Sequence, residues 1–312
     1  MPDFHEIGNE IAGEINKRMS VVLPYDFVRK SYVAKLHELT KRNVILYYSA
    51  WQQKQHVKNL PHAENLSIED YDMNGFMSVV HGLDRHKGLD LILHTPGGDL
   101  AATEAIGSYL KKHFSNDIRV IVPHLAMSGG TLLAFAARQI VMGIHSSLGP
   151  IDPIINGLPA HGICEEFSEA LESVMKTPAT IEVWKHIIAK YPPSFIGDCR
   201  KAIQWSDDIA TRWLADGMFA DITDEAQRNE RVEKIVRSFG DHETTKSHSR
   251  HYMADQCIDL GLKILQLEED DELQDAVLSV HHACNYMLGL PNVVKMIENH
   301  VGKTHAIVMQ PN

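Results

Sequence analysis

LDLILHTPGGD, residues 89–99, is the stretch that decides the fold. Its first six residues form a short, mostly apolar run, which predicts a strand over 89–94, and a Pro-Gly-Gly turn follows at once. The next stretch, residues 100–114, is typical of a helix. A strand that passes through a glycine turn into a helix begins a βαβ unit, so we expect a largely parallel sheet.

The same alternation continues on both sides of this stretch. Tyr47 and Tyr48 end the first predicted strand, and we expect one to pack in the core and the other at its edge. We expect a helical arm over 1–40, one α/β domain over 41–265 and a helical extension over 266–312. Strands are predicted over 44–51, 118–123 and 139–144, and helices over 4–19, 73–83, 128–137 and much of 165–239.

Composition narrows the class of protein. The chain has 312 residues, 44% of them hydrophobic and 23% charged, which is typical of a globular protein with a sizeable core. Its formal net charge of -11 argues against nucleic acid and anionic membranes as partners. The four cysteines are scattered without a C-x-x-C pair, which favours reduced thiols in a cytoplasmic protein. We find no signal sequence and no apolar run of roughly 20 residues, so we expect a soluble protein.

Two glycine turns hold the candidate chemistry. HLAMSGGT, residues 124–131, places Ser128 on a sharp turn between a predicted strand and a predicted helix. The N–H of Gly129 would then face a developing oxyanion, and the N–H of Gly98 in the first turn supplies a second donor. A serine before glycines is also a common helix N-cap, so Ser128 alone does not settle the chemistry. The turns lack a P-loop lysine and the pattern G-x-G-x-x-G, and we expect no nucleotide cofactor.

A resemblance to a known family rests on three motifs. TPGG at 95–98, MSGGT at 127–131 and SSLGPIDP at 146–153 together resemble the Clp-protease/crotonase superfamily, and more closely its serine dehydrogenase proteinase family. The resemblance covers roughly residues 42–262. It implies a ClpP/crotonase-like α/β fold, in which helices surround a parallel sheet. It also implies a serine peptidase that acts on peptides or proteins without a cofactor, and that assembles as a homo-oligomer.

The resemblance implies the site residues as well. Ser128 matches the nucleophile, Gly98 and Gly129 match the two oxyanion donors, and Asp152 of SSLGPIDP matches the carboxylate. The family histidine precedes a helix that ends in Gly-Leu. A serine hydroxyl needs such a base, and a carboxylate fixes the tautomer of the histidine.

Two histidines compete for the role of the base. The matching stretch is SHSRHYMADQCIDLGL, residues 247–262, and counting back from its glycine without gaps selects His248. Many relatives have H-x-Y-P-I there, whereas this chain has H-S-R-H-Y, so His251 remains an alternative.

Other functions stay open at this stage. A Ser–Lys dyad would use Lys176, Lys185 or Lys190, although no motif supports them. A metal site is not expected, because H-E-x-x-H is absent and His281 and His282 are neighbours on a predicted helix. Crotonase-type enzymes hold an acyl-coenzyme A enolate with the same paired N–H groups and need no serine. A scaffold that binds peptides without catalysis is the third alternative.

Overall fold

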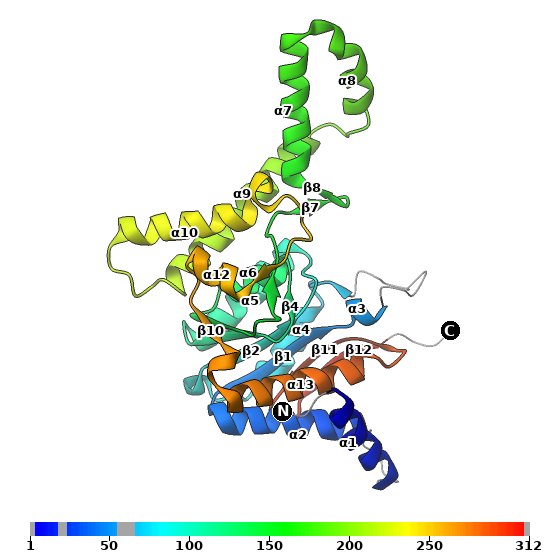
Figure 1. Cartoon of the computed structure of the whole chain (residues 1–312), viewed down its shortest axis with the longest axis vertical. Helices are drawn as coiled ribbons and strands as arrows, with labels where there is room; N and C mark the ends of the chain where they lie inside the picture. Colours follow the sequence, from blue (N-terminus) through cyan, green and yellow to red (C-terminus); the bar gives the residue numbers. More distant parts are fainter. Residues whose placement is uncertain (1–3, 18–23, 55–65, 309–312) are drawn as a thin grey trace.

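A seven-stranded sheet forms the centre of the computed structural model, which describes residues 4–17, 24–54 and 66–308 (Figure 1). Five neighbouring strands run parallel, β11 lies antiparallel to β1, and β12 lies antiparallel to β11. In spatial order the strands are β10 (Ile264–Gln266), β5 (Gln139–Met142), β3 (Ile118–Val122), β2 (Leu89–His94), β1 (Asn43–Ser49), β11 (Val293–Asn299) and β12 (Thr304–Val308).

Helices cover both faces of this sheet. On one face α1 (Phe4–Lys17), α2 (Pro24–Thr40) and α13 (Asp271–Leu288) pack in a core with Val44, Leu46 and Tyr48 of β1. The other face is covered by α4 (Asp72–Val80), α5 (Leu100–Phe114), α6 (Gly129–Phe135), α9 (Phe195–Asp216), α10 (Glu225–Gly240) and α12 (Ala254–Leu260). The shorter elements are α3 (Trp51–Lys54), α11 (His242–Thr245), η2 (Arg85–Lys87), η3 (Pro178–Thr180), η4 (Leu267–Glu269), β4 (Leu125–Ala126), β6 (Ser147–Leu148), β7 (Ile154–Ile155), β8 (Leu158–Pro159) and β9 (Tyr252–Met253).

The sequence-based fold prediction holds for four of the five parallel strands, β1, β2, β3 and β5, whereas no strand was predicted at β10. The strand over 89–94 and the helix over 100–114 have the predicted bounds. Two details are wrong. The segment 266–312 is not wholly helical, since α13 is followed by β11 and β12, which extend the central sheet. Tyr47 and Tyr48 are both fully buried, because this strand lies inside the sheet and both of its faces are covered.

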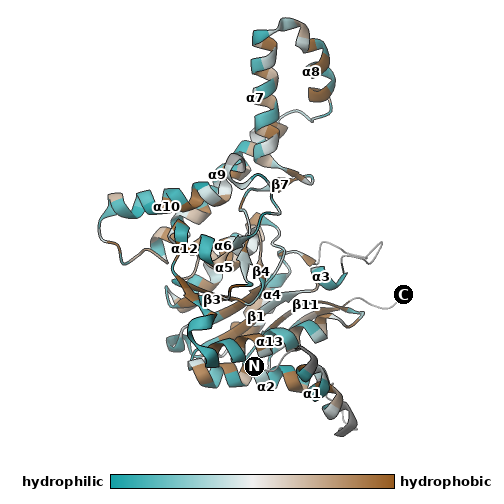
Figure 2. Ribbon diagram, in the orientation of Figure 1, coloured by the Kyte–Doolittle hydropathy of each residue, from teal (hydrophilic) through white to brown (hydrophobic). Residues whose placement is uncertain are grey.

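A helical hairpin projects from the body of the molecule. It consists of α7 (Ala160–Lys176) and α8 (Ile181–Ile188), and Figure 1 shows it standing beyond α9 at one end of the fold. Its surface is partly apolar (Figure 2), and Leu171 and Met175 are 68% and 83% exposed.

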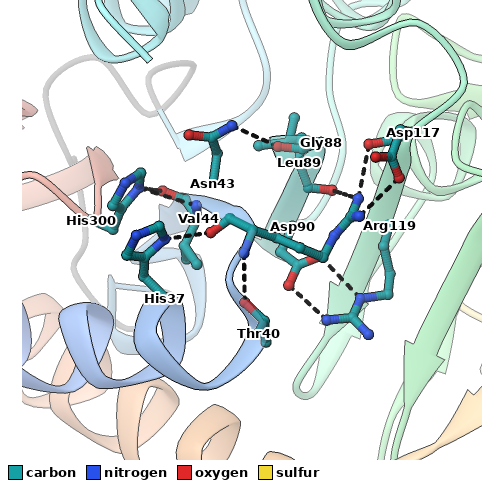
Figure 3. Close-up of polar contacts among 11 residues, drawn as sticks. His37, Thr40, Asn43, Val44, Gly88, Leu89, Asp90, Asp117, Arg119 and His300 are labelled. Carbon is teal, nitrogen blue, oxygen red and sulfur yellow. Dashed lines mark hydrogen bonds and ion pairs between the residues drawn. The ribbon is translucent and has the colours of Figure 1, made fainter. Parts of the chain in front are cut away.

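A charged cluster joins the amino ends of the parallel strands. Asp90 at the start of β2 is fully buried, and its carboxylate accepts hydrogen bonds from Arg119 of β3 at 3.0 and 2.7 Å (Figure 3). Arg42 donates a third hydrogen bond to Asp90 at 2.7 Å and pairs with Asp117 at 2.8 Å. These ion pairs therefore hold β1, β2 and β3 together at their amino ends. The glycine turns lie at the opposite, carboxyl ends of the strands.

Candidate active site

Ser128 occupies a turn that few side chains adopt. It precedes α6 with φ 52° and ψ -116°, a positive φ that is uncommon for a residue other than glycine. Its side chain does not cap the helix. Such a strand-to-helix turn presents a hydroxyl to one side of the sheet, as in the nucleophile elbow of serine hydrolases.

The two glycine turns lie directly against each other. The N–H of Thr95 donates to the carbonyl of Leu125 at 3.1 Å, and the N–H of Met127 donates to the carbonyl of Thr95 at 3.0 Å. Gly97 has φ +95°, and a Cβ added there would lie 2.6 Å from the Ser128 Cβ and 2.8 Å from the Gly129 nitrogen. Glycine is required at this position by both the conformation and the close approach.

The third motif is tied to the turn of Ser128. Thr131 donates its hydroxyl to the carbonyls of Ala126 and Gly149 at 2.9 and 2.8 Å, and it accepts from the Gly149 N–H at 3.0 Å. This contact sets the start of the segment that leads to Asp152. Asp152 is 1% exposed, and its carboxylate accepts from the His161 N–H at 3.4 Å.

His248 shares a pocket with Ser128. The pocket has a volume of ≈ 590 Å³ and is lined by both glycine turns, by Ser128 and by His248. Burial lowers the pKa of His248 below 6.5, although the nearby main chain of Asp152 acts in the opposite direction. Among the described residues no hydrogen bond joins Ser128 to His248, and Nδ1 of His248 is buried without a partner of good geometry. Catalytic hydrogen bonds often tighten only when substrate binds.

The rival bases lie elsewhere. His251 is exposed, does not line this pocket, and contacts the Ser147 hydroxyl through Nδ1 at 3.0 Å. Lys176 and Lys185 belong to α7 and α8 of the projecting hairpin, and Lys190 follows α8. Of these candidates, His248 is therefore the one that the fold brings to the pocket of Ser128.

Several other residues that line the pocket were not predicted from the sequence. Ile68 pairs with Gly98 as a short parallel bridge, and Ser67 and Glu69 beside it also face the pocket. The remaining wall is mainly apolar and includes Leu132, Ile151, Ile154 and Trp205. No local pattern marks residues 67–69, because their place depends on pairing with a turn about thirty residues away.

Three histidine rings pack behind the turns, at the carboxyl ends of β1, β2 and β3. The ring of His94 lies 5.7 Å from that of His124 and 5.2 Å from that of His281, between ring centroids. Trp51 contacts His94 at 4.4 Å. Burial, aided by His124, lowers the pKa of the fully buried His94 to about 3. Among the described residues no group of three or more His, Cys, Asp or Glu side chains is arranged to hold a metal ion.

Comparisons with known proteins agree with this geometry. The family model described as "ClpP-like SDH-type serine proteinase" matches residues 22–190, more than half of the chain. The chain belongs to this family. The match contains both glycine turns, Ser128 and Asp152, whereas His248 lies beyond it. The α/β fold and the resemblance expected from the motifs are thus confirmed.

Two relatives are uncharacterized proteins of Methanocaldococcus jannaschii. MJ0137 is 36% identical over 147 residues, which are 46% of this chain and 50% of the relative. MJ1495 is 46% identical over 86 residues, which are 28% of this chain and 29% of the relative. The matched part of the chain thus spans half of one curated relative and less of the other. None of the helices in the described part of the chain has the length and apolar composition needed to cross a membrane.

Proposed function

We propose that the protein hydrolyses peptide or amide bonds through an acyl-serine intermediate on Ser128. The observation that carries this proposal is the pocket in which Ser128, on its strained turn, and His248 meet two glycine turns. His248 accepts the hydroxyl proton as Ser128 attacks the carbonyl carbon, and it returns that proton to the leaving amine. Water then attacks the acyl-serine with His248 again acting as the base.

The oxyanion is held by main-chain N–H groups in this proposal. Gly98 and Gly129 contribute one N–H each, and both residues line the pocket beside Ser128. A Cβ added to Gly129 would lie 3.4 Å from the Gly98 nitrogen, so the main chains of the two proposed donors lie close together. Asp152 is the carboxylate that orients His248 in this proposal, and its main chain lies within hydrogen-bonding reach of His248. A pKa of His248 below 6.5 favours the neutral, proton-accepting imidazole near neutral pH.

Covalent labelling with a fluorophosphonate tests this assignment. Wild type is expected to be labelled, Ser128→Ala to lose all labelling, and His248→Ala to react at least ~100-fold more slowly. Ser67→Ala is the matched control, since this serine lines the same pocket and is expected to keep wild-type labelling. His251→Ala is the control for the histidine.

Hydrolysis of fluorescently labelled casein then tests the peptidase activity. Cleavage that disappears with Ser128→Ala supports the full proposal. Labelling that survives in Ser128→Ala, or a wild type that resists the probe and leaves casein intact, refutes it.

A further inference from the structure

A buried ion pair lies beside the pocket without touching it. Lys295 of β11 and Asp72 of α4 are both fully buried, and Nζ of Lys295 lies 2.8 and 2.9 Å from the two carboxylate oxygens. The hydroxyl of Tyr47 donates to the same carboxylate at 2.7 Å. A buried ion pair is often no more stable than apolar residues of the same volume, so stability alone explains its presence poorly.

The pair holds the main chain of residues 67–69. Nζ of Lys295 donates to the carbonyl of Ser67 at 2.6 Å, and the N–H of Glu69 donates to the Asp72 carboxylate at 3.1 Å. The main-chain groups on each side of Ile68 are therefore bound by opposite ends of one ion pair.

Ile68 itself faces the first glycine turn. Its N–H donates to the carbonyl of Gly97 at 2.7 Å, and its carbonyl accepts from the N–H of Asp99 at 2.8 Å. These two hydrogen bonds bracket Gly98. The approach is so close that a Cβ added to Gly98 would lie 2.2 Å from the Ile68 nitrogen. The direction of the Gly98 N–H is thus set by where Ile68 is held.

A second branch of the network reaches the same turn. The hydroxyl of Thr95 is within hydrogen-bonding reach of Tyr47, and Thr95 Oγ1 accepts from the N–H of Gly97 at 3.1 Å. Thr95, which accepts from Gly97, therefore lies next to Tyr47, whose hydroxyl donates to the ion pair of Asp72 and Lys295.

We propose that Lys295 and Asp72 are positioning residues that aim the Gly98 N–H at the oxyanion. This inference rests on the proposed function, since it assigns a task to Gly98 in acyl transfer. Lys295 lies in a C-terminal strand outside the matched residues 22–190, so a segment distant in sequence completes the site. A donor that is displaced but not removed should lose part of the ~10²–10³-fold contribution that one oxyanion donor makes.

The test compares two buried ion pairs that each have one member on β11. Lys295→Met with Asp72→Asn removes both charges beside the turn. Arg29→Met with Glu298→Gln removes the control pair, which is likewise fully buried and joined at 3.0 and 2.7 Å. Glu298 binds α2, on the side of the sheet away from the turns, and does not line the pocket. Both double variants remove an ion pair with two fully buried side chains, so they should lose comparable stability.

The experiment measures two quantities. One is the rate of fluorophosphonate labelling at saturating probe, and the other is the probe concentration that gives half of this rate. For Lys295→Met with Asp72→Asn we expect the saturated rate to fall ~10-fold or more, with half-saturation and the pH midpoint unchanged. A role in stability alone would lower the melting temperature in both double variants without this selective loss of rate.

The outcomes separate this inference from the proposed function. If wild type is not labelled on Ser128, both fail. If wild type is labelled and the two double variants react equally fast, the positioning role alone is wrong. Should Lys295→Met with Asp72→Asn fail to fold, Tyr47→Phe removes one hydroxyl of the network and keeps both charges. It is then expected to slow the saturated rate by ~3-fold, and an unchanged rate would overturn the inference.

Discussion

The buried histidine behind the glycine turns predicts a marked loss of stability in mild acid. His94 is fully buried, and burial lowers its pKa to about 3 in the folded protein, against about 6.5 for a histidine in the unfolded chain. The unfolded chain therefore binds more protons than the folded chain between these two values. Folding is favoured above pH 6.5 and loses stability as the pH falls toward 3. Over the whole interval the difference corresponds to ~5 kcal/mol, and between pH 7 and pH 5 to ~2 kcal/mol.

The variant His94→Leu removes this titration and keeps a side chain of similar size. Urea unfolding at pH 7 and pH 5, followed by circular dichroism at fixed protein concentration, measures the free energy of unfolding at each pH. Wild type should lose ~2 kcal/mol more than His94→Leu between the two pH values. The exposed His86→Leu is the control and should keep the wild-type pH dependence. An equal loss in wild type and His94→Leu would refute the argument from burial.

Three further predictions concern the site, the charged cluster and one helix. The labelling rate of Ser128 should rise with pH with a midpoint below 6.5, because burial lowers the pKa of His248; a midpoint above 7 in a pH series would contradict this. Asp90→Ala should lower the free energy of unfolding by ~3 kcal/mol in a urea titration, since it leaves two arginines without their buried carboxylate. The partly exposed Asp117→Ala should cost ~1 kcal/mol or less in the same titration, and equal losses would count against the explanation. Gly13→Ala in α1 should raise the stability of the fold by ~0.5–1 kcal/mol, as an added Cβ meets no atom of the described residues within 4 Å; a lower melting temperature would show otherwise.

Local patterns were enough to predict four of the five parallel strands, β1, β2, β3 and β5. The segment 89–114 joins an apolar run, a glycine turn and a helical spacing, and its strand and helix have the predicted bounds. The C-terminal strand β11 was missed for a physical reason. All seven of its residues are buried, yet two of them are Lys295 and Glu298. Charged residues in a buried strand conceal it, because the partners that neutralise them lie more than two hundred residues away.

The site could be predicted only in part for a similar reason. Ser128 and Gly98 belong to short motifs whose residues meet through neighbouring strands, so their proximity follows from the parallel sheet. His248 comes from a loop far along the chain, and its selection over His251 rested on the family resemblance. The structure adds that His248 lines the pocket, whereas the tasks of these residues in catalysis stay predictions.

The position of β11 decides how much of the chain a complete site requires. β11 pairs with β1 along Ile45–Ser49, so without it the strand that carries Tyr47 would become an edge of the sheet. Asp72 would then be a buried carboxylate without its ammonium partner, which costs far more than the intact pair contributes. Since Asp72 also holds Glu69 beside the first glycine turn, the loss would reach the pocket. Residues 22–190 therefore carry the proposed nucleophile, both proposed oxyanion donors, Asp72 and Asp152, whereas the proposed base His248 and the ammonium partner Lys295 lie beyond that range.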